Sequence, residues 1–155
     1  MRLRPILYGV LALPLLLSLL GSLGLRAADN AMTVFKTSTC TCCIKWVEHL
    51  RAKGFQVTVQ DVPSTDEYSR KHGVPEAQRS CHVGVIDGYA IEGHVPAAEI
   101  QRLLKERPEA KGLAVAGMVA GSPGMEVAGG RRDRYSVVLF GADGRTSVYQ
   151  EYPGN

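Results

Sequence analysis

The sequence lacks internal repeats, and outside its apolar start it lacks low-complexity tracts. These absences exclude solenoid, collagen-like and coiled-coil architectures. Net charge is also scarce: three arginines in the first 28 residues account for the whole formal charge of +3, and the remaining charges balance. A nucleic-acid-binding protein needs a basic face, so we expect no nucleic-acid partner. Disorder is excluded as well, because 45% of the 155 residues are hydrophobic, enough for one folded domain.

One long apolar run is present, at the start of the chain. A short basic segment, Met1 to Pro5, precedes an uncharged, leucine-rich stretch from Ile6 to Leu25. This order is typical of a secretory signal peptide, although about 20 apolar residues also suffice to anchor a chain in a membrane. We therefore predict that residues 1–28 are a signal peptide or an N-terminal membrane anchor. Residues 29–155 are predicted to form a single domain outside the cytoplasm, in contact with a membrane only if the leader is uncleaved.

Hydrophobic periodicity and turn residues predict the elements of this domain. Strands are expected at 33–36, 55–62, 83–86 and 89–91, and helices at 43–53, 64–73 and 97–107. Residues 109–130, rich in glycine, alanine and methionine, are expected to form a long loop. Strands at 135–140 and 146–152 flank Asp143-Gly144 and predict a C-terminal hairpin. The sequence therefore predicts an α/β fold of thioredoxin-like order, β-α-β-α-β-β-α, with an added hairpin.

Three of the four cysteines, Cys40, Cys42 and Cys43, lie where the first strand passes into the first helix. Cys40 and Cys43 have the Cys-x-x-Cys spacing of redox dithiols, and a helix N-terminus favours thiolates. Cys42 departs from that pattern, because a third thiol would compete for disulfide exchange. Three thiolates in four residues are instead suited to converge on a soft metal ion.

Cys81 precedes the third strand, which in a thioredoxin-like arrangement runs antiparallel to the first, so we expect its sulfur beside the other three. Thiolates select Cu(I), zinc or iron–sulfur clusters. Structural zinc commonly uses two separate Cys-x2-4-Cys pairs, whereas adjacent cysteines in one motif favour a sulfur-bridged, multinuclear Cu(I) cluster. Zinc stays an alternative. Two structural disulfides are a simpler alternative. However, a disulfide between cysteines so close in the sequence closes only a small loop, which constrains the unfolded chain little.

Four further side chains are weaker candidate ligands: His82, His94, Met118 and Met125. Imidazole suits Cu(II) and zinc, and thioether sulfur suits Cu(I). A site that offers both could hold copper in both oxidation states. Each of these residues is also a type that commonly serves only packing or the surface.

Six segments of the sequence together resemble the CopG-type copper-resistance proteins. The resemblance runs from about residue 32 to 152 and rests on the following segments: Thr39 to Cys43, Lys45 to Val47, Ser80 to His82, Asp87 to Tyr89, Glu92 to Pro96 and Gly121 to Glu126. It implies an exported, periplasmic, thioredoxin-like protein of a Gram-negative bacterium, associated with copper tolerance. It further implies a redox-active copper centre at Cys40, Cys42, Cys43 and Cys81, and a copper-export component as partner. Thr41 and Val119 depart from the glycine and proline expected in relatives.

The resulting hypothesis is a periplasmic copper protein that holds Cu(I) in a four-cysteine centre and interconverts Cu(I) and Cu(II). Two other functions remain open. One is a thiol–disulfide oxidoreductase that uses Cys40 and Cys43, with Cys81 as the resolving thiol. The other is a zinc-binding module. Whether the protein is an enzyme, a carrier or a sink does not follow from the sequence.

Overall fold

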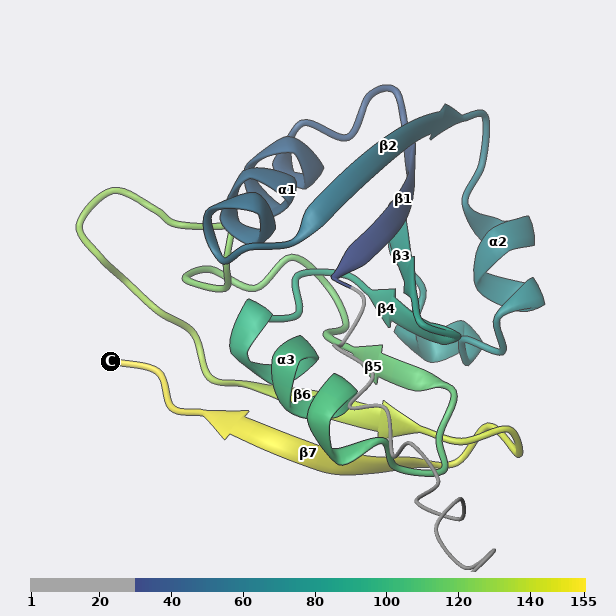
Figure 1. The fold of residues 1–155 in the computed structure, drawn as a ribbon. Helices are drawn as coiled ribbons and strands as arrows, with labels where there is room; N and C mark the ends of the chain where they lie inside the picture. Colours follow the sequence, from purple (N-terminus) through teal and green to yellow (C-terminus); the bar gives the residue numbers. More distant parts are fainter. Residues whose placement is uncertain (1–29) are drawn as a thin grey trace, which may run out of the picture.

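Seven strands form one mixed sheet in the computed structural model, which describes residues 30–155, in the order β2-β1-β3-β4-β5-β6-β7 (Figure 1). The strands are β1 (Ala31–Thr37), β2 (Gln56–Val62), β3 (His82–Ile86), β4 (Tyr89–Glu92), β5 (Gly112–Ala114), β6 (Tyr135–Phe140) and β7 (Thr146–Tyr152). The helices are α1 (Cys42–Ala52), α2 (Asp66–Lys71) and α3 (Ala97–Glu106), with a short 3₁₀ turn, η1 (Glu76–Gln78). The predicted leader lies outside the described residues.

The first half of the sheet has the predicted element order. β1 pairs parallel with β2, and β3 runs antiparallel to both β1 and β4. The α/β class and the order of the first seven elements are therefore confirmed. The thioredoxin-like name stays a prediction, which this strand order supports.

The prediction of an uninterrupted loop at 109–130 was wrong, because that segment contains β5. This strand pairs parallel with β4 and antiparallel with β6, so the C-terminal hairpin continues the central sheet. β5 has only three residues, all buried, and therefore shows no alternation of polar and apolar positions. At its start the two backbones are in close contact, since a Cβ on Gly112 would meet the carbonyl oxygen of Ala90.

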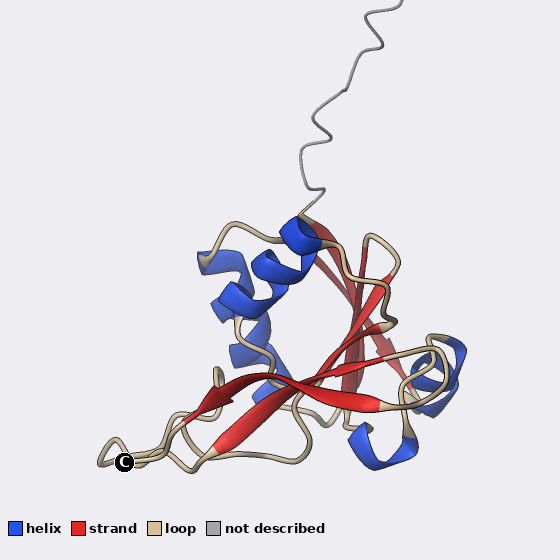
Figure 2. Ribbon diagram, turned by 90° about the horizontal axis from the view of Figure 1, so that it is seen from below, coloured by secondary structure: helices blue, strands red, loops and turns tan. Residues whose placement is uncertain are grey.

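Two apolar layers cover the sheet. α1 and α3 pack on one face, and α2 with η1 lies on the other (Figure 2). The larger core joins Trp46 and Leu50 of α1, Ile100 and Leu103 of α3, and Val34 of β1, among other buried side chains. The smaller core lies on the α2 face, where the rings of Phe35 and Tyr68 stack at 4.0 Å. No helix among residues 30–155 is both long and apolar enough to cross a membrane.

Candidate metal centre

The Cys40–Cys43 segment is placed by the turn between β1 and α1. The backbone N–H of Cys40 donates to the carbonyl of Thr37 at 3.0 Å, which closes this turn at the end of β1. α1 then begins at Cys42, without a side-chain cap from Thr41. Cys42 and Cys43 thus lie in the first helical turn, where unpaired backbone N–H groups favour negative charge on sulfur.

Cys81 lies beside this segment, as the sequence predicts. Antiparallel pairing of β1 with β3 sets Lys36 opposite His82, and the backbone N–H of Thr37 donates to the Cys81 carbonyl at 3.3 Å. The Cys81 sulfur lies 2.7 Å from that of Cys40 and 3.6 Å from that of Cys43. The Cys42 sulfur is 3.6 Å from that of Cys40. We call these four sulfurs the sulfur centre.

The sulfur centre is partly oxidised. Cys40 and Cys43 form a disulfide, whereas Cys42 and Cys81 are free thiols. Among the described residues there is thus one disulfide, not the two of the plain structural alternative. Burial, reinforced by the neighbouring Cys42, raises the pKa of the Cys81 thiol to about 11. Metal binding by Cys81 therefore has to displace a proton.

His82 completes the group of candidate ligands. Its ring is fully buried, with Nδ1 at 3.2 Å from the Cys43 sulfur and 3.9 Å from the Cys81 sulfur. Burial lowers the pKa of His82 to about 3, with the neighbouring His94 adding to the shift. The ring is therefore neutral at physiological pH, as a metal-binding imidazole must be.

The ring of His94 packs against that of His82. His94 does not belong to the group of closely spaced ligand atoms, which come from Cys40, Cys43, Cys81 and His82. The two rings meet edge to face at 5.0 Å. The Nδ1–H of His94 donates to the Pro123 carbonyl at 2.8 Å, which leaves the lone pair on Nε2. Nε2 of both histidines is buried and has no hydrogen-bond partner among the described residues.

Sequence reasoning missed Glu92, whose side chain binds Ser80, the residue that precedes Cys81. Its side chain is fully buried, and Oε1 accepts hydrogen bonds from the backbone N–H of Ser80 at 2.5 Å and from the Ser80 hydroxyl at 3.1 Å. Oε2 accepts from the Ser69 hydroxyl at 3.0 Å. The one sequence signal is an acidic residue directly after the apolar run Tyr89–Ile91. Burial raises the pKa of Glu92 to about 7.

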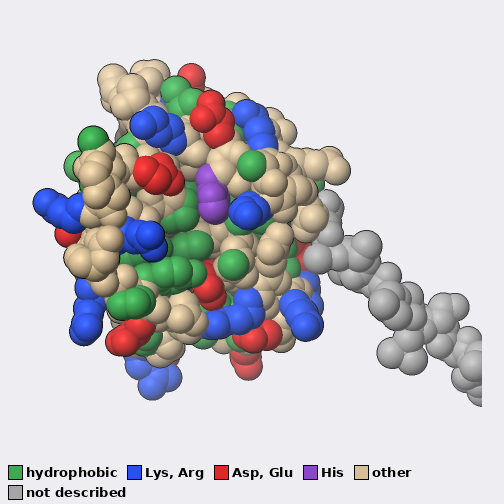
Figure 3. Space-filling view, turned by 90° about the vertical axis from the view of Figure 1, so that its left-hand side faces the viewer, with side chains coloured by type: hydrophobic (Ala, Val, Ile, Leu, Met, Phe, Trp, Pro, Cys, Tyr) green, Lys and Arg blue, Asp and Glu red, His purple; other side chains and the backbone are tan. Residues whose placement is uncertain are grey.

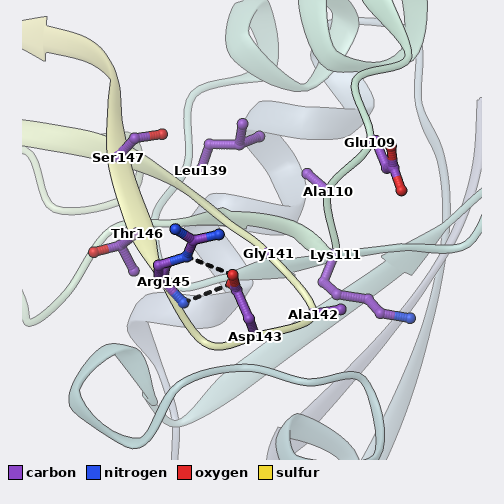
Figure 4. A pocket seen from close by; sticks show the side chains of 10 residues that line it. All are labelled: Glu109, Ala110, Lys111, Leu139, Gly141, Ala142, Asp143, Arg145, Thr146 and Ser147. Atoms are coloured by element: carbon purple, nitrogen blue, oxygen red, sulfur yellow. Dashed lines mark hydrogen bonds and ion pairs between the residues drawn. The ribbon is translucent and has the colours of Figure 1, made fainter.

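The two candidate methionines differ in their surroundings. Met118 is 73% exposed. Met125 is half-buried and lines a hollow of about 250 Å³ together with Cys42. A separate hollow of about 770 Å³ lies at the β6–β7 turn, where Lys111 and the Asp143–Arg145 pair contribute to the lining (Figure 4). That hollow has no cysteine, histidine or methionine in its lining, so it offers no soft ligand.

The donor set fits a thiophilic metal ion. The ligand atoms of Cys40, Cys43, Cys81 and His82 all lie within 4.8 Å of one another. The buried, neutral His82 imidazole, whose Nδ1 faces the Cys43 and Cys81 sulfurs, adds a nitrogen donor. Reduction of the Cys40–Cys43 disulfide would release two more thiols at the same place, which gives a cysteine cluster with histidine able to bind metal.

Comparison with known proteins gives close structural relatives. A chain described as "Copper resistance protein copG- Form 1" is 47% identical, with a TM-score of 0.75, and the match covers 80% of this chain and 98% of that one. A second chain, "Copper resistance protein copG- Form 2", is 46% identical, with the same TM-score, over 79% and 98%. A family model described as "Protein of unknown function, DUF411" matches residues 78–125. No curated protein matches.

Proposed function

Because the chain belongs to the CopG family of copper resistance proteins, we propose that its sulfur centre binds Cu(I) as cargo and exchanges electrons with it. One observation carries the proposal: four cysteine sulfurs and the neutral His82 imidazole converge on one partly buried site. Cys40, Cys42, Cys43 and Cys81 are the principal ligands in this proposal, and His82 Nδ1 is the nitrogen ligand.

The number of donors favours more than one copper ion. Four sulfurs and one imidazole make five candidate ligands, more than a single tetrahedral zinc ion uses. Cu(I) prefers soft thiolates, and Cu(II) accepts imidazole. Bridging thiolates from adjacent Cys42 and Cys43 are therefore better suited to a multinuclear Cu(I) cluster than to one zinc ion.

The Cys40 and Cys43 thiols can donate electrons to copper by forming their disulfide. Two Cu(II) ions that meet the reduced Cys40 and Cys43 thiols take two electrons and become two Cu(I) ions, while one S–S bond forms and two protons leave. The reverse reaction opens the disulfide and returns two Cu(II) ions. The centre therefore needs no further cofactor to interconvert the two oxidation states.

The predicted leader gives the place of action in this proposal. Residues 1–28 would export the chain, or hold it at the membrane, so that the copper site faces the periplasm. A copper-export component is the partner that this location suggests. Cutting of the leader would be tested by N-terminal sequencing of the protein recovered from the periplasm.

An anaerobic Cu(I) titration tests the binding. The reduced protein is titrated against a chromophoric Cu(I) chelator, with Cys42→Ser beside the wild type. Thr41→Ala is the matched control, since Thr41 is exposed and makes no capping bond. We expect the wild type and the control to retain more than one Cu(I) per chain, and Cys42→Ser to retain fewer. No Cu(I) retained by the wild type would overturn the proposal.

A thiol–disulfide oxidoreductase is the second candidate, favoured by the Cys40–Cys43 disulfide with Cys81 at 2.7 Å from Cys40. In that case Cys42→Ser would keep disulfide-reducing activity, and Cys40→Ser would lose it. A zinc module would instead unfold on chelation of zinc.

A further inference from the structure

A small hollow opens directly beside the sulfur centre. It measures about 250 Å³ and is lined by Thr41, Cys42 and Lys45 at the start of α1, and by residues 124–127 of the loop after β5. We call it the Cys42 hollow. Its lining contains two sulfur side chains, Cys42 and Met125.

Cys42 connects the Cys42 hollow with the centre. Its thiol is free and half-buried, and its sulfur lies 3.6 Å from that of Cys40. Cys40 and Cys43 are buried, with 6% and 0% of their surface exposed. Cys81 is also half-buried but does not line the hollow. A ligand in the hollow therefore meets the centre at Cys42.

Met125 is held in place on the other wall. Its backbone N–H donates to the Ser122 carbonyl at 2.8 Å, and its own carbonyl accepts from Gly121 at 2.9 Å. The preceding Gly124 is packed so closely on α1 that a Cβ there would lie 2.7 Å from the backbone nitrogen of Trp46. The loop thus fixes the backbone of Met125 close to the helix that carries Cys42, and both residues line the hollow.

Charge does not single out a ligand on this side of the molecule. Where α1 and this loop reach the surface, hydrophobic side chains lie among acidic and basic ones (Figure 3). The Cys42 hollow itself contains one group of each sign, Lys45 and Glu126. Selection by the hollow therefore has to come from its sulfurs, which suit Cu(I).

We propose that Met125 and Cys42 form an entry site through which Cu(I) reaches and leaves the sulfur centre. The inference rests on the proposed function and adds the route. Cu(I) keeps its oxidation state along this route. A bond to the Met125 sulfur forms as the donor ligand leaves, and the Cys42 thiolate then replaces the thioether, with the thiol proton released to water. A neutral thioether is a ligand that a thiolate readily displaces.

Transfer kinetics separate this route from binding itself. The full chain is reduced under anaerobic conditions, loaded from the Cu(I) bicinchoninate complex, and unloaded with bathocuproine disulfonate, with absorbance followed in both directions. Three proteins are compared: wild type, Met125→Leu and Met118→Leu. Both substitutions nearly conserve volume and are expected to fold. Met118 is the matched control, because it has the same chemistry, is 73% exposed and does not line the hollow.

We expect Met125→Leu to hold the wild-type amount of copper at equilibrium but to load and unload about tenfold more slowly. Met118→Leu is expected to match the wild type in all three quantities. The entry route is wrong if Met125→Leu transfers copper at the wild-type rate, if Met118→Leu is slowed equally, or if Met125→Leu loses copper at equilibrium. Failure of the wild type to retain Cu(I) at all would overturn the proposed function, and the route with it.

Discussion

The backbone N–H of Ser80 donates a 2.5 Å hydrogen bond to the buried carboxylate of Glu92, and this contact fixes the residue next to Cys81. The Ser80 hydroxyl bonds both to Glu92 and to the carbonyl of His82 at 3.0 Å. Thr65 donates to the Ser80 carbonyl at 2.9 Å. Both neighbours of Cys81 are therefore tied to one polar network, which holds the cysteine against α1.

Glu92→Gln is expected to change how stability depends on pH. The pKa of Glu92 is raised from 4.5 to about 7 by burial, so between these values the folded chain binds a proton that the unfolded chain lacks. The contribution of Glu92 to the free energy of unfolding therefore falls as pH rises through this window, by about 2–3 kcal/mol in all. The variant should lose this fall. Urea unfolding of the metal-free protein at pH 4.5 and 8 measures it.

Glu48→Gln is the control for this comparison, because Glu48 is exposed on α1. It should reproduce the wild-type change between the two pH values. Equal pH dependence in wild type and Glu92→Gln would show that Glu92 does not titrate in the folded chain as the buried network implies.

His82→Phe is expected to resist acid better than the wild type. The pKa of His82 is lowered from 6.5 to about 3, so below pH 6.5 the unfolded chain takes up a proton that the folded chain excludes. The contribution of His82 to stability is complete above pH 6.5 and is lost as the pH falls toward 3, by about 1.4 kcal/mol per pH unit. Urea midpoints of the metal-free protein at pH 7 and 4.5 test this. The half-buried His72, changed to Gln, should have a smaller effect; an equal effect would contradict the prediction.

Cys81 is expected to alkylate slowly at neutral pH. Its pKa is raised to about 11, chiefly by burial, and only the thiolate reacts. With the Cys40–Cys43 disulfide intact, the rate of iodoacetamide labelling at Cys81 should rise about tenfold per pH unit from pH 8 to near 11. Peptide mass spectrometry reports the adduct. Free N-acetylcysteine is the reference, and its rate should level off near pH 9. A Cys81 rate that levels off at the same pH would refute the shift.

The sequence predicts the individual strands of the fold better than it predicts how they join into one sheet. Strands at 135–140 and 146–152 are predicted at their observed bounds, because alternation and the Asp143-Gly144 turn both mark them. β5 was missed, since three buried residues have no period. Its absence from the prediction detached the hairpin from the sheet to which β5 joins it.

The candidate site, too, could be predicted from the sequence only in part. The position of Cys81 follows from strand direction alone, so the sulfur centre could be predicted. The role of Glu92 could not, because it depends on which loop meets the end of β4. Met118 and Met125 are chemically alike in the sequence, and only the packing of the loop on α1 separates an exposed side chain from one that lines the Cys42 hollow.

Gly124→Ala is expected to weaken the loop that positions Met125. Gly124 has φ of +85°, and a Cβ would lie 2.7 Å from the Trp46 nitrogen and 3.2 Å from the Cys42 carbonyl oxygen. The substitution therefore adds a backbone clash to the strain of a left-handed alanine. Gly129→Ala is the matched control: φ is +84° but nothing lies within 4 Å of its Cβ position. Strain alone should cost about 1 kcal/mol in the control, and the clash about 1–3 kcal/mol more in Gly124→Ala. Thermal and urea unfolding measure both losses, and copper transfer rates should fall only in Gly124→Ala. Equal losses in the two variants would mean that the loop does not rest on α1 as described.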